Sequence, residues 1–333
     1  MPLDVVVPDL LLPAEAPAAL RAVRMPALER WIARADRGRV DRNGRHAWVA
    51  HAHALPEPLP VAAITLAADD APREGTWLRA DPVHLRIEMH GATLHDANVL
   101  DVQGEKTTAL VAELQSFFRA DGLEFLAPHP SRWYVRVPPA ELPQTTPLEQ
   151  VLGRNVSASL PRGSGRIEWR SAITEAQMVL ATHAVNVHRE QAGQPQINSV
   201  WFWGGGATPA IASRPYSVIY ADDAFTRGVA RLAGTRVAEL PRGFDAIDAV
   251  AAGENALLVL DGLSTAWDRG DEAAWKDAAA AIDAWFVHAG NALERFGEMR
   301  IVLPSAGPAR VFTLKPSSRW RLFRRGKPVN ADA

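Results

Sequence analysis

Three consecutive glycines follow an apolar, aromatic run, Asn198–Trp203, where the backbone could come close to an anion. The stretch lacks the Lys-Ser/Thr of a P-loop and the Gly-x-Gly-x-x-Gly spacing of a dinucleotide site. A tight turn with close backbone packing is therefore the favoured interpretation. If a ligand binds, we expect it at the carboxyl ends of parallel strands, with other polar groups beside the glycines. The candidate ligand- or anion-binding residues are Gly204, Gly205, Gly206, Asn186, Arg189 and Arg227.

Aspartate and histidine side chains offer a second chemistry, metal binding. His51 and His53 would share one face if residues 51–53 formed a strand, and a partly exposed strand face is favoured over a transition-metal site. Several of the aspartates also fit loop and helix N-cap positions. We expect no metal and no cofactor; Mn or Zn would be the metal if a site formed. The weak candidate ligands are Asp9, Asp261, Asp268, Asp271, His51 and His53.

The tail from Lys315 interleaves cations with aromatic residues, a pattern that can bind phosphates and stack on single-stranded nucleic acid. A strand hairpin with a solvated arginine face is the favoured interpretation. The candidate contacts to nucleic acid are Arg319, Arg321, Arg324 and Arg325.

Composition excludes several classes of protein. The 333 residues are 47% hydrophobic and 22% charged, as expected for a globular chain with a sizeable core. The formal net charge of −2 gives no global attraction to nucleic acid or to an anionic membrane. Cysteine is absent, which excludes disulfides and thiolate chemistry and fits a reducing, cytoplasmic compartment. No stretch is long and apolar enough to predict a membrane span, and the apolar run in residues 1–13 predicts a buried first strand.

Apolar runs that alternate with helical patterns predict an α/β fold with a mostly parallel sheet and helices on both faces. Strands are expected at 198–203, 216–220, 256–260 and 300–303, and helices at 224–233 and from 272 to about 296. Strands at 83–87, 99–101 and 133–137 with a helix at 107–120 predict a small inserted α+β domain. The predicted boundaries are 1–76 and 150–314 for the core domain, 77–149 for the inserted domain with its return linker, and 315–333 for the basic tail.

One region of the chain resembles a known family. Thr174 and Gln177 form a capping box for a helix predicted to continue through His183–Arg189, and the triple-glycine strand follows it. This order, with the segment Phe225–Gly234, resembles the archaeal-type cofactor-independent phosphoglycerate mutases of the alkaline phosphatase superfamily. The segments Trp77–Leu85 and Asn198–Gly206 are similar to bacterial RpfE-type regulatory proteins.

The resemblance implies two divalent metals, held by Asp and His, that flank a phosphorylated Ser or Thr. Where the family has Asp and His in its Asp-Glu-Ala-Gly-His segment, this chain has Ser264 and Asp268. Ser305 stands in place of the Asp in the family's Pro-Asp-His, and Asp9 alone could replace a ligand near the N-terminus. No Ser nucleophile is evident between residues 48 and 68. Because a two-metal mechanism needs these groups, the resemblance implies loss of catalysis.

Three functions follow as hypotheses. The favoured one is a non-catalytic, regulatory relative of the mutases that binds an unknown protein or a small phosphorylated ligand. The second is an active metal-dependent phosphoglycerate mutase or phosphatase with a displaced site. The third is binding to a partner or to nucleic acid through the basic tail.

Overall fold

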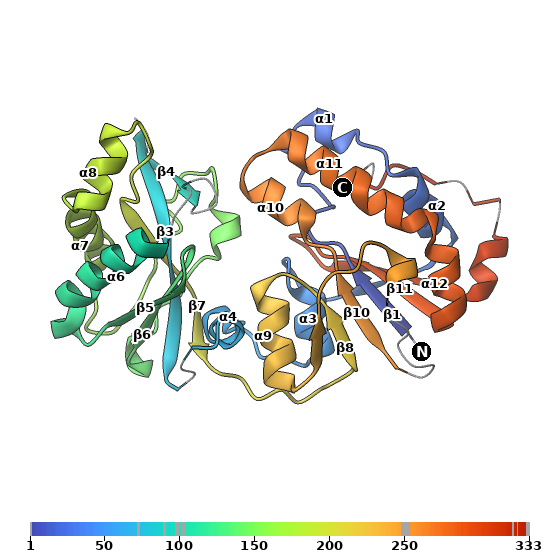
Figure 1. Cartoon of the computed structure of the whole chain (residues 1–333), viewed down its shortest axis with the longest axis horizontal. Coiled ribbons are helices and arrows are strands. Elements are labelled where there is room, and N and C mark those ends of the chain that lie inside the picture. Colours follow the sequence, from blue (N-terminus) through green and yellow to red (C-terminus); the bar gives the residue numbers. More distant parts are fainter. Residues whose placement is uncertain are drawn as a thin grey trace. The chain divides into compact units, whose positions relative to one another are not determined.

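The computed structural model describes residues 2–71, 74–88, 91–96, 100, 104–247, 254–321, 323, 324 and 326–330. The chain forms two compact units, the first made of Met1–Leu55 with Ile211–Ala333 and the second of Pro56–Ala210 (Figure 1).

The first unit is built on a seven-stranded sheet. Parallel pairs join β1 to β10 and β11, β10 to β8, and β8 to β9, whereas β12 runs antiparallel to both β11 and β2. The predicted mostly parallel α/β sheet is therefore confirmed, with the N-terminal strand at its centre. In spatial order the strands are β2 (Asp36–Val40), β12 (Ala309–Leu314), β11 (Glu298–Leu303), β1 (Pro2–Val6), β10 (Ala256–Val259), β8 (Val218–Tyr220) and β9 (Arg236–Ala238).

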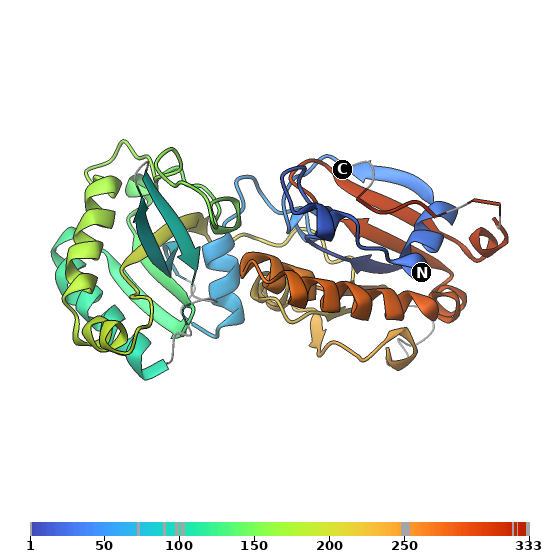
Figure 2. The same cartoon turned by 90° about the horizontal axis from the view of Figure 1, so that it is seen from above.

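Helices cover both faces of this sheet. Along β1, Leu3 and Val5 are fully buried in the main apolar cluster, because alternate strand residues face the same side. That cluster includes residues of five helices, among them the long α11 that runs along the sheet in Figure 2. Asp4, which lies between Leu3 and Val5 in β1, faces the other side of the sheet and accepts a hydrogen bond from Trp48 of α3 (Ala47–Ala52). The five helices are α1 (Ala18–Arg21), α2 (Pro26–Arg34), α10 (Gly262–Asp268), α11 (Glu272–Val287) and α12 (Ala289–Phe296).

The helix α9 (Ala224–Ala233) shows how local sequence fixes an element. Asp223 caps its start, where the side chain accepts a hydrogen bond from the Thr226 amide at 2.8 Å. Gly234 ends it with φ +67°, a left-handed conformation that glycine adopts without strain. Both the helix and its two ends agree with the sequence prediction.

The second unit holds a five-stranded antiparallel sheet, in which β3 pairs with β4, β6 and β7, and β6 pairs with β5. Helices α6 and α7 contribute to the apolar cluster on one face, and α4 packs against Trp77 and Tyr134 in another cluster. The strands are β3 (Thr76–Glu88), β4 (Gly91–Asp96), β5 (Glu124–His129), β6 (Arg132–Val137) and β7 (Ser199–Ala207). The helices are α4 (Val61–Ala68), α6 (Gly104–Phe118), α7 (Trp169–Ala181) and α8 (Ala184–Gln191).

The observed boundaries differ from the predicted insertion at 77–149. The second unit extends from Pro56 to Ala210, because β7 pairs with β3 and α4 packs on both strands. The strand expected at 198–203 therefore belongs to the antiparallel sheet and not to the parallel one. A strand's partner is not encoded locally, which explains why its apolar sequence alone led to the wrong sheet.

Several predicted elements also change in detail. The helix expected to open at Thr174 begins at Trp169, where the Glu168 carboxylate accepts the Ser171 amide hydrogen bond at 2.7 Å, and it ends before His183. The helix expected to run from 272 to 296 is interrupted at His288. The prediction of a strand hairpin in the tail is wrong, because β12 is followed by a 3-10 helix at Pro316–Trp320. In the strand predicted at 99–101, residues 99 and 101 lie outside the described residues.

Candidate functional site

Acidic residues gather where the central parallel strands of the first unit end. Asp9 follows β1, Asp222 and Asp223 follow β8, and Asp261 follows β10. Because these strands are parallel neighbours, their carboxyl ends lie at one edge of the sheet. The helix α10, which begins directly after Asp261, adds a further carboxylate from its last residue.

A single arginine connects two carboxylates at this edge. The Arg45 Nε atom lies 2.7 Å from Asp9 Oδ2. Its two terminal nitrogens donate to the two oxygens of Asp268, at 2.8 and 2.7 Å. The side chains of Arg45, Asp9 and Asp268 are 18%, 24% and 12% exposed, so solvent screens these ion pairs only in part. We call Asp9, Arg45, Ser264 and Asp268 the Arg45 cluster.

Ser264 completes the cluster. Its hydroxyl donates a hydrogen bond to Asp9 Oδ2 at 2.6 Å, and the residue is 5% exposed. Asp9 Oδ2 therefore receives both a hydroxyl proton and the guanidinium charge. In this arrangement the Ser264 hydroxyl donates its proton to the Asp9 carboxylate, which Arg45 also binds.

The loop that carries Arg45 is held on both sides. The amide of Gly44 donates to the Ser305 carbonyl at 2.7 Å, which ties the loop to the segment after β11. The ring of His46 stacks on Phe225 of α9, with centroids 4.0 Å apart. These contacts within the chain hold the Arg45 guanidinium at the carboxyl edge of the sheet.

The acids after β8 and β10 lie in the same electrostatic environment. Burial, together with the charges of Asp223 and Asp222, raises the pKa of Asp261 to about 6, while Arg45 acts in the opposite direction. Burial also raises the pKa of Asp223, whose Oδ2 has no hydrogen-bond partner among the described residues. One guanidinium thus compensates a group of carboxylates that repel one another.

The remaining candidate metal ligands are elsewhere. The predicted strand at 51–53 is wrong, because these residues end the helix α3 and the two imidazoles point in different directions. His53 is fully buried, its Nδ1 lies 2.9 Å from the Val49 carbonyl, and burial lowers its pKa. Asp271 caps α11 by accepting the Ala274 amide hydrogen bond at 2.9 Å. Within the described ranges, no group of three or more His, Asp or Glu side chains could hold a metal.

The triple glycine lies inside β7, and not in a loop beyond a parallel strand. At Gly204, with φ +63°, a Cβ atom would lie 2.9 Å from the Val61 Cβ atom of α4. At Gly206 it would lie 2.6 Å from the Cβ atom of Pro60, directly before that helix. Close packing of α4 on β7 therefore requires these glycines, so the predicted close backbone packing is confirmed and the predicted tight turn is wrong.

The other candidate anion-binding residues are not brought together with one another in a single cluster. Asn186 is fully buried and makes three backbone hydrogen bonds of 2.8 Å, donating to the Leu180 and Ile197 carbonyls and accepting from the Ile197 amide. Arg189 is also buried and donates to the Pro195 carbonyl at 2.8 Å. Arg227 belongs to the first unit, where it lies 3.4 Å from the Ala221 carbonyl. An anion site at the glycines stays a prediction.

The paired strands β3 and β7 hold a buried ion pair. Arg79 binds the Asp81 carboxylate at 2.6 Å and 3.0 Å, and Trp203 donates to the same carboxylate at 2.7 Å. Both charged residues are less than a tenth exposed. These polar residues of the Trp77–Leu85 and Asn198–Gly206 segments therefore hold two strands in register.

The basic tail is partly neutralised by its own unit. Arg321 binds Asp36 at 2.6 Å, Arg319 pairs with Glu294, and Arg324 donates to the Ala35 carbonyl at 3.2 Å. Arg325 lies outside the described residues. All three described arginines of the tail are thus engaged locally, which leaves less positive charge for nucleic acid.

Comparison with known proteins relates part of this chain to one class of enzyme. No protein-family model matches the chain. The 2,3-bisphosphoglycerate-independent phosphoglycerate mutase of Methanosarcina acetivorans is 27% identical over 184 residues, which are 52% of this chain and 46% of that protein. The enzyme of the same name from Methanothrix thermoacetophila is 31% identical over 115 residues, 33% of this chain and 29% of that protein. Over these residues the chain is homologous to the mutases, and the matches span less than half of their length.

A solved structure agrees at the level of the fold. The PH0037 protein of Pyrococcus horikoshii superposes with a TM-score of 0.57, covering 98% of this chain and 90% of that one at 15% sequence identity. No helix among the described residues is long and apolar enough to cross a membrane.

Sequence reasoning missed Arg45. Its partners lie 36 residues before it and 223 residues after it, so no local spacing pairs them. The neighbouring residues, Gly44 and His46, resemble an ordinary loop before a helix.

Proposed function

We propose that this chain is a non-catalytic relative of the cofactor-independent phosphoglycerate mutases that serves as a binding and regulatory protein. The observation that carries the proposal is the Arg45 guanidinium, bound by Asp9 and Asp268 at the carboxyl edge of the parallel sheet. Homology to the mutases supports the origin of the fold, and the Arg45 cluster supports the change of role.

The residues present do not fit a two-metal centre. Two adjacent divalent ions need several anionic or imidazole ligands, and here Ser264 offers a neutral hydroxyl that already donates to Asp9. Arg45 cannot lose its proton in a protein, so its positive charge is permanent. A divalent ion about 5 Å from it would meet a repulsion of about 6–7 kcal/mol at an effective dielectric constant of about 20. An internal cation thus supplies the charge compensation that metals supply in a two-metal enzyme.

The regulatory part of the proposal depends on the RpfE-type resemblance. The two segments that carry it, Trp77–Leu85 and Asn198–Gly206, are on the paired strands β3 and β7. Their buried Arg79–Asp81 pair and their packed glycines suit a rigid platform rather than a reaction centre.

Turnover tests the proposal directly. The purified chain is supplied with Mn²⁺ and assayed for interconversion of 2- and 3-phosphoglycerate and for hydrolysis of p-nitrophenyl phosphate. We expect the same rate for the wild type and for Asp9→Ala. A Mn²⁺-dependent rate that Asp9→Ala abolishes would refute the proposal.

An active enzyme with a displaced site is the second candidate function. The observation that favours it is the raised pKa of Asp261 next to Asp222 and Asp223, since clustered acids with shifted pKa values are frequent at active sites. This candidate predicts Mn²⁺-dependent turnover that Asp261→Asn abolishes and that Asp277→Asn, an exposed position on α11, leaves unchanged.

A further inference from the structure

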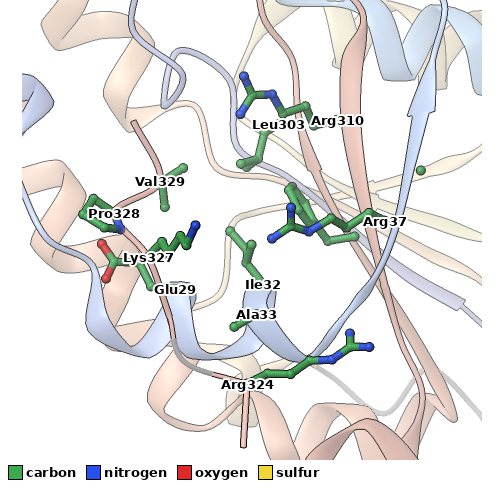
Figure 3. A pocket seen from close by; sticks show the side chains of 12 residues that line it. Glu29, Ile32, Ala33, Arg37, Leu303, Arg310, Arg324, Lys327, Pro328 and Val329 are labelled. Atoms are coloured by element: carbon green, nitrogen blue, oxygen red, sulfur yellow. The ribbon is translucent and has the colours of Figure 1, made fainter. Parts of the chain in front are cut away.

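A basic cavity lies apart from the residues of the Arg45 cluster in the first unit. It has a volume of about 640 Å³ and is lined by α2, β2, β12, the last residue of β11 and the tail (Figure 3). This volume is typical of small-molecule sites. None of its lining residues belongs to the Arg45 cluster, so a ligand in this cavity would not depend on whether metal binds at the carboxyl edge of the sheet.

Cations predominate in the lining. Four of the lining residues are cations, Arg37, Arg310, Arg324 and Lys327, and one is an acid, Glu29. That acid is already bound by Arg24, whose nitrogens lie 2.5–3.0 Å from its oxygens, and its side chain is 1% exposed. The chain as a whole has a net charge of −2, so four cations in one cavity do not reflect a general basic excess.

Strand pairing concentrates this charge on one face of the sheet. Arg37 pairs with Phe312, and Arg39 pairs with Arg310, on the antiparallel strands β2 and β12. Because alternate strand residues share a face, the three arginines lie on the same side as Phe312. In Figure 3, Arg37 and Lys327 point toward one another across the cavity.

The cavity also has an apolar wall. Ile32, Leu303, Phe312 and Val329 line it, and Leu303 and Phe312 belong to the main apolar cluster. A ligand that contacts the whole surface therefore needs an anionic group and an apolar part. Guanidinium groups bind phosphate oxygens through two parallel hydrogen bonds, which favours a phosphoryl group as the anion.

We propose that this cavity binds a small phosphate monoester whose carbon part packs against Phe312 and Ile32, with Arg37, Arg310 and Lys327 around the phosphate. This goes beyond the proposed function, because it assigns a ligand class to a surface that the mutase relationship does not describe.

Calorimetric titration of the full chain tests the proposal with three probes: phenyl phosphate, inorganic phosphate and phenol. We expect phenyl phosphate to bind more tightly than inorganic phosphate, phenol not to bind, and added salt to weaken binding. Arg37→Gln and Lys327→Gln should each weaken phenyl phosphate binding at least about tenfold. The matched control is Arg236→Gln, at an exposed position on β9 at the opposite edge of the sheet, which should change binding less than about twofold.

Thermal unfolding of the same variants without ligand shows whether they fold. Removing one of several facing cations should leave the melting temperature of Arg37→Gln equal to that of the wild type or higher. The proposal is overturned if phenyl phosphate does not bind the wild type, or if binding is unaffected by Arg37→Gln and Lys327→Gln. It is also overturned if Arg236→Gln weakens binding equally, since the effect would then be one of general charge.

Discussion

Replacing Asp261 with Asn should stabilise the first unit at neutral pH and not in mild acid. Burial, together with the charges of Asp223 and Asp222, raises the pKa of Asp261 from 3.8 to about 6. A carboxyl group whose pKa is raised by folding binds its proton more tightly in the folded state. Its contribution to stability is therefore full below the unfolded pKa and is lost as the pH rises through the folded pKa.

The magnitude follows from the two pKa values. The difference of about 2.2 units corresponds to about 3 kcal/mol between pH values well below and well above them. Between pH 4.5 and 7.5 the wild type should lose about 2 kcal/mol from this group, and the residual solvent access of the side chain reduces that figure somewhat. An Asn has nearly the same shape and no charge, so the variant lacks this loss.

Urea unfolding of the wild type and Asp261→Asn at pH 4.5 and 7.5 measures the effect. The free energy of unfolding of the variant minus that of the wild type should be larger at pH 7.5 than at pH 4.5, by about 2 kcal/mol. The matched control is Asp277→Asn on the exposed face of α11, which should show no such difference. A difference of the opposite sign, or an equal effect at both pH values, would refute the electrostatic account of this edge.

Two further predictions concern the second unit and are measured by urea unfolding. Gly204→Ala should lower the free energy of unfolding by about 1–3 kcal/mol, because its Cβ atom would lie 2.9 Å from the Val61 Cβ atom at φ +63°. Gly193→Ala, at φ +68° with nothing within 4 Å, separates the backbone cost from the contact, and equal losses would contradict the packing account. Asn186→Ala should cost about 2–4 kcal/mol because it leaves the Ile197 amide and carbonyl without their buried partner; a loss below about 0.5 kcal/mol would contradict that role.

The parallel sheet was largely predictable, because its signals are local. Val5 and Val6 in β1 and the strand at 256–259 are apolar runs of strand length, and α9 has an N-cap aspartate and a C-terminal glycine. Such signals give the type of an element and its approximate ends. They are independent of what the element packs against.

The errors concern features that depend on distant partners. The strand β7 has the same apolar character as a parallel core strand, and only its pairing with β3 places it in the other sheet. The alternation at His51 and His53 covers three residues, too few to distinguish a strand from the end of a helix. The candidate aspartates Asp9 and Asp268 were predicted, but their connection through Arg45 depends on tertiary structure alone.

Metal content tests the central claim most directly. The purified wild type is equilibrated with Mn²⁺ or Zn²⁺, desalted, and analysed for metal per chain. If Arg45 has taken over the charge compensation at the carboxyl edge, metal should be near zero per chain. About two metal ions per chain would contradict the account, because a two-metal centre would then coexist with the Arg45 guanidinium.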